Sequence, residues 1–584
     1  MNDLNDVIVL IGMLNKKGIF LLSLFCTIIV VCFLIAVFYL FKMLKIRTHK
    51  YLLYLQQDEY APSRFWKWYK KNKAFDKKVA IITILFIIYE ITLKLRYYSK
   101  YAHLGDVFYY YVVRVISFCA FVFIAWKVIR KELDPATSKN AKIPLNLTFR
   151  ARRIRGISLL LTVMLFFLIT LYPSFDSHYY PLVIALCFQF IPFSLMLSVV
   201  ILSPHEKKTR EKFLNEAKEK FSKVSPYVIA VVGSYGKSTV KNMLGEILQA
   251  AKGGTFWPKA GINTIMGITR KIREELKDTD KYAVIEMGTY RKGSISSICE
   301  LTPPNAAILT AINHMHLERF KTRENIYEAK TEVIKALPKD GILVCNGDDD
   351  FVLRAYNKAD IKNKFLYGLE RKDGIKDGIK LDAYLTDIKY SNNGTTAKIY
   401  WKENEYNVRT KIVGSGGLSS LLACFTMACA MGLEPKTVVD IIASIEPLSN
   451  RLVLKNYGNN LIYLEDGYNS NPLGFDAALD VLKALDVKRR IVMTPGIIEL
   501  GKTQFEENYK IALKITKICD KVIFVGNENK EAYKKAFDEQ NFKNVQYVES
   551  REEGFKELTS YQEAGDGVLI ENDLPDWYEA KVDF

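Results

Sequence analysis

Long apolar runs fill the first third of the chain, and shorter apolar stretches separated by polar ones fill the rest. The long runs cover 19–41, 79–93, 107–126, 157–172 and 181–202. The first has 23 residues, or about 34 Å as an α-helix, which is long enough to cross a bilayer. The second and fourth are short for a span. The pattern predicts a helical transmembrane module of about five spans over residues 1–205.

Basic residues flank these runs unequally, which predicts an orientation. Segments 42–78 and 127–156 contain 11 and 9 Lys and Arg, whereas 94–106 contains 3 and 173–180 contains none. By the positive-inside rule the two rich loops are cytoplasmic. Five spans then place residue 206 onward on the cytoplasmic side of the cell membrane. The first run is too long for a signal peptide, and no small-residue cleavage site follows it.

Two ionisable residues, Glu90 and Arg114, lie inside apolar runs at similar predicted depths. An unpaired charge there is costly. We therefore expect the two either to pair or to reach the interface separately.

The net charge of +18 is divided unevenly between the two parts of the chain. Residues 1–205 account for +16 and residues 206–584 for +2. A nucleic-acid-binding domain would need a basic face on the soluble part, so this distribution disfavours nucleic-acid binding. The nine cysteines include no C-x-x-C pair, and four lie in apolar runs (Cys26, Cys32, Cys119 and Cys187). Reduced packing residues fit this pattern better than disulfides or a metal site.

Beyond a charged connector at 206–226, apolar strands alternate with helical stretches. Strands are predicted at 227–232, 282–286, 306–310 and 341–345, and helices at 237–250 and 323–337. Alternation of this kind predicts a parallel α/β sheet. Segment 381–411 instead has the pattern of a β-hairpin. A second α/β unit begins near 452, with strands near 461–465, 489–494, 521–525, 544–548 and 566–570.

A phosphate loop is predicted at the first of these strands. Residues 227–239 read YVIAVVGSYGKST, a buried-type strand, a glycine turn and the start of a helix. Backbone N–H groups of such a turn bind phosphate, Lys237 can reach the β- and γ-phosphates, and Ser238 or Thr239 can ligate Mg²⁺. The spacing departs from G-x-x-x-x-G-K-[ST], because residue 231 is Val. A strand–turn–helix with a chance lysine is the alternative.

Three further groups could complete an active site. Glu286 ends a predicted strand, where a carboxylate can hold Mg²⁺, although it could also be a surface residue. His314 and His316 follow another strand and could bind a metal, although a capping role is commoner for such residues. Lys330 lies on a helix between glutamates, a context that by itself predicts a solvated lysine.

Together these residues resemble the Mur ligase superfamily of ATP-dependent amide ligases. The order G-S-Y-G-K-S-T, E-M-G, a T-x-I-x-x-x-H-L-E segment and an A-K helix is similar to its central-domain signature. The second unit resembles the MurF type, which adds D-alanyl-D-alanine, through Asn450-Arg451, the segment 465–472 (EDGYNSNP) and Glu499-Leu500-Gly501. The resemblance covers roughly 225–570. It implies a P-loop ATPase domain over 206–449 and a Rossmann-like α/β domain over 450–584, after the transmembrane module.

The resemblance also implies roles for individual residues. The ATP phosphates and one Mg²⁺ would be held by Gly233, Ser234, Gly236, Lys237, Ser238 and Thr239. Metal would be positioned by Ser238, Glu286 and His316. A carbamylated Lys330 would bind a second Mg²⁺. Arg451 would contact the γ-phosphate, Asp466 the ribose, and Asn263 the substrate.

Three departures from the family pattern qualify these roles. Ser420 replaces an asparagine that binds adenine in the family. Residues 570–575 (IENDLP) are acidic where the MurF type has a K-G-S-like sequence, which questions the usual amine substrate. A membrane module stands in place of the soluble domain that grips the UDP end of the precursor.

These features predict a membrane-anchored, ATP-dependent ligase that joins a carboxylate to an amine of the cell envelope. It would act through an acyl phosphate, with the bilayer and the two substrates as partners. A poly-γ-glutamate synthase-like amide ligase is one alternative. A nucleotide-binding membrane scaffold without ligase activity is another, although the retained Lys237, Glu286, His316 and Lys330 argue against it. Few intramembrane charges leave little sign of a transport pathway.

Overall fold

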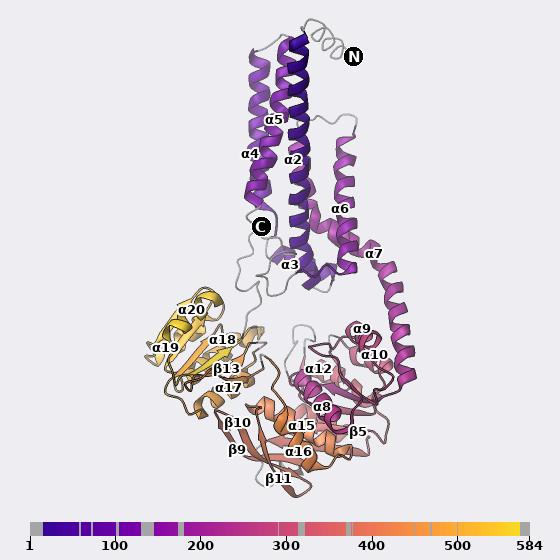
Figure 1. Cartoon of the computed structure of the whole chain (residues 1–584), viewed down its shortest axis with the longest axis vertical. Coiled ribbons are helices and arrows are strands. Elements are labelled where there is room, and N and C mark those ends of the chain that lie inside the picture. Colours follow the sequence, from indigo (N-terminus) through magenta and orange to yellow (C-terminus); the bar gives the residue numbers. More distant parts are fainter. Residues whose placement is uncertain are drawn as a thin grey trace. The chain divides into compact units, whose positions relative to one another are not determined.

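The computed structural model describes most of the chain, in two compact units that meet between Lys207 and Lys208 of a single helix (Figure 1). The described residues are 16–57, 60–71, 74–100, 104–129, 145–172, 180–289, 291–313, 320, 322–369, 375–376, 378–449, 451–467, 470–498 and 500–572.

The first unit is built from helices. They are α2 (Lys16–Gln57), α3 (Pro62–Lys71), α4 (Lys77–Lys100), α5 (Leu104–Ile129), α6 (Phe149–Thr170) and the first part of α7 (Tyr180–Val224). Four of the five predicted apolar runs lie within one of these helices, and the run at 157–172 extends two residues beyond α6. Within the described residues, three stretches are long and apolar enough to cross a membrane: Ser23–Gln57, Phe149–Thr170 and Leu182–Val224. The side chains of Glu90 and Arg114 lie outside the described part, so their predicted pairing stays a prediction.

Polar contacts join the helices of this unit at one end. Arg47 of α2 pairs with Asp76, which precedes α4, at 2.7 Å, and both side chains are fully buried. The Gln189 amide of α7 donates to the Asp76 carbonyl and accepts from its N–H. Arg155 of α6 lies 3.0 Å from the His49 ring of α2. Because buried polar groups need specific partners, these contacts fix how the helix ends pack.

The second unit contains a nine-stranded sheet in the order β11-β10-β9-β6-β5-β4-β1-β3-β2. Its strands are β1 (Tyr227–Val232), β2 (Thr255–Phe256), β3 (Tyr282–Glu286), β4 (Ala306–Leu309), β5 (Ile342–Asn346), β6 (Asn363–Leu369), β9 (Ala383–Ser391), β10 (Gly394–Trp401) and β11 (Asn404–Thr410). The strands from β2 to β9 pair in parallel, and β9, β10 and β11 form an antiparallel meander. The predicted parallel α/β sheet is confirmed, and the predicted hairpin has a third strand.

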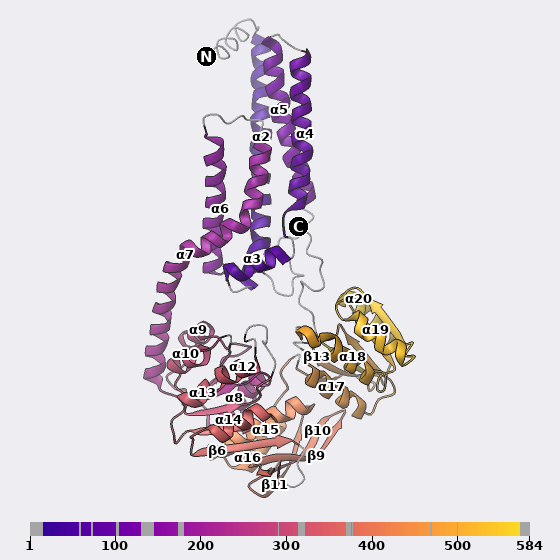
Figure 2. The same cartoon turned by 180° about the vertical axis from the view of Figure 1, so that it is seen from behind.

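Helices cover both faces of this sheet (Figure 2). One face packs against α8 (Lys237–Lys252), α15 (Ser415–Ala430) and α16 (Pro435–Ser444). The other packs against the end of α7 and against α9 (Ile265–Glu275), α10 (Ser294–Leu301), α12 (Arg323–Lys330), α13 (Glu332–Ala336) and α14 (Asp350–Lys358). The helix predicted at 323–337 is divided at Thr331, which ends α12. Ala217 and Phe221 of α7 are buried in the core with Ile268 and Ile272 of α9, so the end of α7 belongs to this domain.

A six-stranded sheet follows, in the order β12-β13-β17-β14-β15-β16. Its strands are β12 (Val453–Asn456), β13 (Ile462–Asp466), β14 (Arg490–Thr494), β15 (Lys521–Val525), β16 (Val545–Val548) and β17 (Gly567–Glu571), all parallel except β12. One face packs against α17 (Pro472–Ala484), α18 (Gln504–Ile515) and α19 (Lys530–Glu539), and the other against α20 (Arg551–Tyr561). A short 3₁₀ turn, η2 (Gly501–Thr503), precedes α18, and β7 (Ile375–Lys376) pairs with β8 (Ile379–Lys380) elsewhere. This is the predicted second α/β domain.

Candidate active site

The turn between β1 and α8 requires glycine at two of its positions, 233 and 236. A Cβ atom at Gly233 would lie 1.9 Å from the Thr310 hydroxyl, so no side chain fits there. Gly236 has φ +78°, a left-handed conformation that favours glycine. The Thr310 hydroxyl at the end of β4 donates to the Tyr235 carbonyl at 2.5 Å. The turn is therefore held in shape before any ligand binds.

Lys237 opens α8 beside this turn, as predicted. Its ammonium donates to the Ser234 carbonyl at 3.1 Å. Burial lowers the pKa of Lys237, Glu286 opposes that shift, and the nearby Arg451 adds to it. The effect of Arg451 on this pKa indicates that its positive charge acts at the phosphate loop.

Glu286 lies at the centre of a hydrogen-bonded group at the carboxyl edge of the sheet. Its side chain is buried, and its Oε2 accepts from the Ser238 hydroxyl at 2.8 Å. The Asn263 amide donates to its Oε1 at 2.9 Å. The Lys241 ammonium lies 3.4 Å from Oε2 and donates to the Ala260 carbonyl. A hydroxyl and a carboxylate side by side form an oxygen donor set that suits Mg²⁺.

Lys241 is a site residue that the sequence analysis missed. A lysine on an amphipathic helix usually points to solvent, but this side chain is fully buried. Lys241 lies four residues after Lys237 and therefore on the same face of α8. That spacing is the signal that could have identified it.

Lys330 lies at the end of α12 and reaches the other side of the phosphate turn. Its ammonium donates to the Gly233 carbonyl at 2.8 Å, and the side chain is buried. Burial lowers the pKa of Lys330 well below its usual value, and Lys237 contributes in the same direction. The sequence context alone predicted a solvated lysine, and burial in the structure is the correction.

Three predicted site residues remain: Ser234, Thr239 and His316. Ser234 accepts from the Asn313 N–H at 2.9 Å, and Thr239 continues α8 after Ser238. His316 lies outside the described residues. Within the described part of the chain, no three His, Cys, Asp or Glu side chains come together to hold a metal. The metal-binding role predicted for His316 therefore stays a prediction.

The position where the family has an adenine-binding asparagine is buried. The Ser420 hydroxyl donates to the Gly416 carbonyl of its own helix at 2.9 Å. A Cβ on Gly236 would lie 3.1 Å from the Ser420 oxygen. The Ser420 side chain therefore packs against the phosphate turn at Gly236.

Two carboxyl groups meet at the carboxyl edge of the second sheet. Asp466 and Glu571 end the neighbouring strands β13 and β17 in register. Burial raises the pKa of Asp466 to about 6, although Arg451 and the Leu452 N–H oppose the shift. Burial raises the pKa of Glu571 well above its usual value, Asp466 adds to this, and a hydrogen bond from Ser470 opposes it. This edge therefore favours protonated carboxyl groups.

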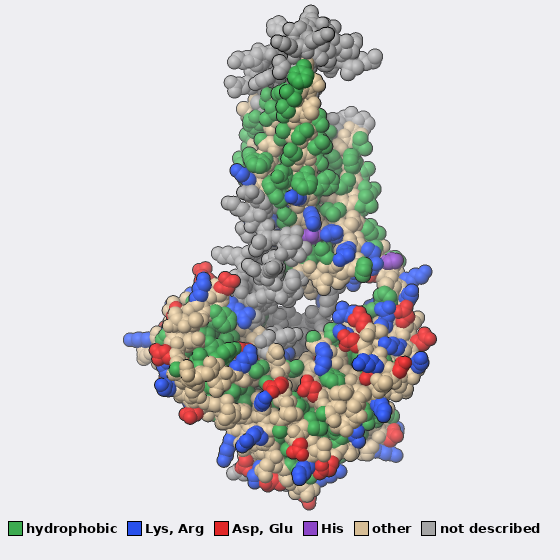
Figure 3. Space-filling model, in the orientation of Figure 1, with side chains coloured by type: hydrophobic (Ala, Val, Ile, Leu, Met, Phe, Trp, Pro, Cys, Tyr) green, Lys and Arg blue, Asp and Glu red, His purple; other side chains and the backbone are tan. Residues whose placement is uncertain are grey.

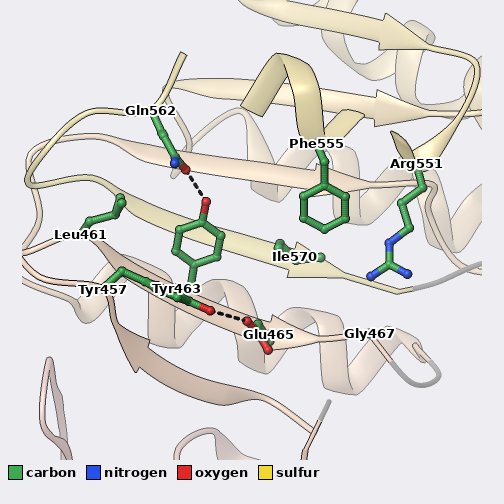
Figure 4. Close-up of a pocket in the computed structure, with 9 residues that line it drawn as sticks. All are labelled: Tyr457, Leu461, Tyr463, Glu465, Gly467, Arg551, Phe555, Gln562 and Ile570. Atoms are coloured by element: carbon green, nitrogen blue, oxygen red, sulfur yellow. Dashed lines mark hydrogen bonds between the residues drawn. The ribbon is translucent and has the colours of Figure 1, made fainter. Parts of the chain in front are cut away.

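A separate pocket of about 370 Å³ lies on the opposite face of the same strands (Figure 4). Tyr463 and Tyr457 line it with ring centroids 5.0 Å apart, and Phe555 of α20 lies across from them. Glu465 in this pocket already pairs with Lys455 at 2.6 Å. Because side chains alternate along a strand, Glu465 faces the pocket while Asp466 faces the other side. The pocket is therefore not part of the candidate active site.

Comparison with known proteins agrees with this geometry. Residues 231–428 match the Mur ligase middle domain, and residues 450–571 match the glutamate ligase domain of Mur ligases. The chain belongs to the Mur ligase superfamily. It is thus a member of a family of ATP-dependent ligases.

Two curated relatives of this Mur ligase family member are UDP-N-acetylmuramoyl-tripeptide–D-alanyl-D-alanine ligases. The protein from Haemophilus influenzae is 28% identical over 55% of this chain and 69% of its own length. That from Bacillus subtilis is 28% identical over 49% of this chain and 59% of its own. The chain thus spans between 59% and 69% of the length of these two relatives.

Solved structures share the fold. MurF ligase from Thermotoga maritima, determined in complex with ADP, aligns with a TM-score of 0.54 and 24% identity. The alignment covers 62% of this chain and 80% of that one. A MurF from Acinetobacter baumannii also aligns with a TM-score of 0.54, at 22% identity.

Proposed function

We propose that this chain is a membrane-anchored, ATP-dependent ligase that joins a carboxylate to an amine in peptidoglycan-precursor synthesis. The observation that carries the proposal is the convergence of Lys237, the Ser238–Glu286 pair and Lys330 on one glycine turn. Membership of the Mur ligase superfamily and relatives named as UDP-N-acetylmuramoyl-tripeptide–D-alanyl-D-alanine ligases support the same chemistry.

The residues of the site fit a nucleoside triphosphate with Mg²⁺. The cradle at Gly233 and Gly236 leaves backbone groups open to an anion, and the start of α8 adds its positive dipole end. Ser238 and Glu286 would hold a Mg²⁺ ion, which would neutralise phosphate charge when bound. A second ion near Lys330 stays part of the proposal, as does the role predicted for His316.

The proposed reaction has two steps. A carboxylate oxygen of the first substrate bonds to the γ-phosphorus of ATP while the bond to ADP breaks, which gives an acyl phosphate. The amine then bonds to the acyl carbon, phosphate leaves with the carbon–oxygen bond electrons, and the amine nitrogen loses a proton. Phosphoryl transfer depends on positioning and charge neutralisation. Lys237 and Arg451 would stabilise the transferred group from two domains.

Carbamylation of Lys330 is part of the proposal and is chemically favoured by its surroundings. Only an unprotonated amine can add CO₂. The lowered pKa of the buried Lys330 increases that fraction at neutral pH. The product is an anion on a side chain that already reaches the phosphate turn.

Membrane anchoring and the cytoplasmic position of the second unit are proposed from the apolar helices and the loop charges. Both family matches lie within 231–571, whereas the candidate spans lie before residue 225. A precursor held at the inner leaflet of the cell membrane fits this arrangement. Cysteine labelling in intact cells tests it: cysteines placed in 42–78 should be protected and one at 173–180 should react. The reverse pattern would contradict the orientation.

The activity is tested with the purified full-length chain in detergent. We expect ADP release that depends on both a carboxylate and an amine, supplied as panels of envelope precursors, amino acids and dipeptides. Lys237→Ala should abolish the release, whereas Lys252→Ala, at the exposed end of the same helix, should not. ATP binding without turnover for any pair would favour the scaffold alternative.

A further inference from the structure

A collar of basic side chains borders the apolar helices of the first unit. We define the basic collar as the Lys and Arg residues within the described parts of 42–78 and 145–156. These parts contain fourteen Lys and Arg and a single acidic residue, Asp76. Asp76 is buried against Arg47. Among the described residues of these two ranges, the exposed charges are therefore cations, while Asp58 and Glu59 lie outside the described part.

The collar ends where the exposed apolar surface begins, and it does so on three helices (Figure 3). On α2, Lys42 follows Phe41, which is 55% exposed. On α4, Lys78 precedes Ile81, which is 58% exposed. On α6, Arg155 precedes Leu160, also 58% exposed. Lys42 is exposed, and Lys78 and Arg155 are partly exposed. A change from basic to exposed apolar side chains marks the depth at which lipid headgroups lie.

Helix α3 is part of the basic collar, and it has exposed lysines on one face. Trp68 stacks on Tyr54 of α2 with ring centroids 4.1 Å apart, and Trp66 lies 5.3 Å from Phe193 of α7. These aromatic contacts hold α3 against the other helices. Lys67, Lys70 and Lys71 share the remaining face and are exposed.

The first two turns of α6 contain a cluster of arginines, and these positive charges are unfavourable at a helix N-terminus unless anions lie nearby. Arg150, Arg152, Arg153 and Arg155 lie in its first two turns, and no acidic residue lies in the first. Cations at a helix N-terminus oppose the helix dipole. Glu206 of α7 pairs with Arg153 at 2.6 Å and lies 3.7 Å from Arg150. One carboxylate offsets only part of this charge.

We propose that the basic collar binds the phosphate headgroups of anionic phospholipids, so that the module prefers a leaflet rich in them. The proposal rests on the membrane placement in the proposed function. Each basic group near an anionic membrane surface adds about 1 kcal/mol of attraction. The continuity of the collar with the apolar surface favours lipid headgroups over a soluble anion as its partner.

The test uses the full-length chain in phosphatidylcholine nanodiscs with a minor fraction of spin-labelled lipid. We expect labelled phosphatidylglycerol to associate with the protein about fivefold more strongly than labelled phosphatidylcholine, as one net headgroup contact predicts. The preference should collapse in about 1 M salt, where the Debye length falls to about 3 Å. Equal association of the two lipids at low salt would overturn the proposal.

A second test removes positive charge from the collar by substitution. The variant Lys45→Gln/Lys67→Gln/Lys71→Gln changes exposed collar residues and should lower the preference at least twofold. The matched variant Lys436→Gln/Lys534→Gln/Lys556→Gln changes exposed lysines of the second unit and should preserve it. An unchanged preference in the collar variant would overturn the proposal. So would competition by millimolar inorganic pyrophosphate, since that would identify a site for a soluble anion.

Failure of this inference is distinguishable from failure of the membrane placement. If alkaline carbonate releases the chain from membranes, the proposed anchoring is wrong. If the chain stays in the membrane fraction but shows no lipid preference, only the collar proposal is wrong.

Discussion

Glu286 and Glu571 occupy equivalent positions in two different sheets, yet their surroundings are opposite. Each is the last residue of a parallel strand, and each is buried. Glu286 accepts hydrogen bonds from Ser238 and Asn263 and lies beside the Lys241 ammonium. Glu571 accepts from Ser470 and lies beside Asp466. Two carboxyl groups at the same position in a strand therefore have opposite kinds of neighbour, cationic and polar at Glu286 and acidic at Glu571.

The carboxyl edges of the two sheets therefore differ in the groups that surround their acidic residues. At the first edge, a hydroxyl, an amide and an ammonium group surround one carboxylate. At the second, two acids share a buried place and favour protonation. The following predictions test that division, from the largest expected effect to the smallest.

Lys237→Ala should have the largest effect, because it removes the cation at the phosphate turn. Loss of one group that stabilises transition-state charge costs about 10²–10³-fold in rate. Initial rates of ADP release measure this, with the Lys252→Ala variant as the control. A parental rate in Lys237→Ala would show that the loop does not bind ATP as proposed.

Glu286→Gln should reduce both activity and stability. The variant leaves Lys241 buried without its anionic partner, and breaking such a pair costs about 3–5 kcal/mol. Thermal unfolding and the Mg²⁺ dependence of ADP release measure the two effects. The exposed control is Glu528→Gln. If Glu286→Gln unfolds at the parental temperature, the Lys241 pair contributes little.

Lys330→Ala should lose most of the activity, because the amine that would be carbamylated is gone. Bicarbonate should not rescue the variant, whereas short carboxylic acids should restore part of the rate by taking the place of the carbamate. ADP release with and without acetate measures the rescue. A fully active Lys330→Ala variant would show that this buried lysine has only a packing role.

Glu571→Gln should have the smallest effect and the opposite sign to Glu286→Gln. The folded-state pKa of Glu571 is raised, so folding binds protons. Stability of the parent should therefore fall as pH rises above about 4.5, the ordinary range of a glutamate. Glutamine resembles the neutral acid, so the variant should not lose this stability as the pH rises. We expect similar unfolding temperatures near pH 5 and a variant that is higher by about 2–4 °C near pH 8. A parallel pH dependence in both proteins would mean that Glu571 is charged in the folded state.

For the second unit, the sequence predicted the longer strands and helices better than it predicted which side chains meet. The strands at 227–232 and 282–286 were located to the residue, because runs of buried Val, Ile and Ala bounded by turns have few other interpretations. The two-residue β2 strand and the antiparallel edge strand β12 were missed, since such short segments leave no periodic pattern. The helix predicted at 323–337 is interrupted at Thr331 and resumes as α13, because the apolar pattern is continuous and carries no sign of the break.

The candidate site was predicted in its motifs but not in its pairings. Lys237 and Ser238 follow from the glycine turn that opens a helix, and Glu286 follows from its place at the end of a predicted strand. The burial of Lys241 and Lys330 depends on helices α8 and α12 meeting the sheet, which no local pattern encodes. The acidic sequence at 570–575 was recognised as a departure, but the coupling of Glu571 to Asp466 depends on two strands a hundred residues apart becoming neighbours.

Helix α7 has a practical consequence for anyone who wishes to study the catalytic half alone. A soluble version that starts at the first β-strand would lack Ala217 and Phe221, which are buried against α9. It would also lack the pairing of Glu216 with Arg273, at 2.8 Å. Loss of a buried phenylalanine alone costs about 3–5 kcal/mol, a large share of the stability of an ordinary domain. The cut belongs near Lys208, so that the last turns of this helix are expressed with the enzyme.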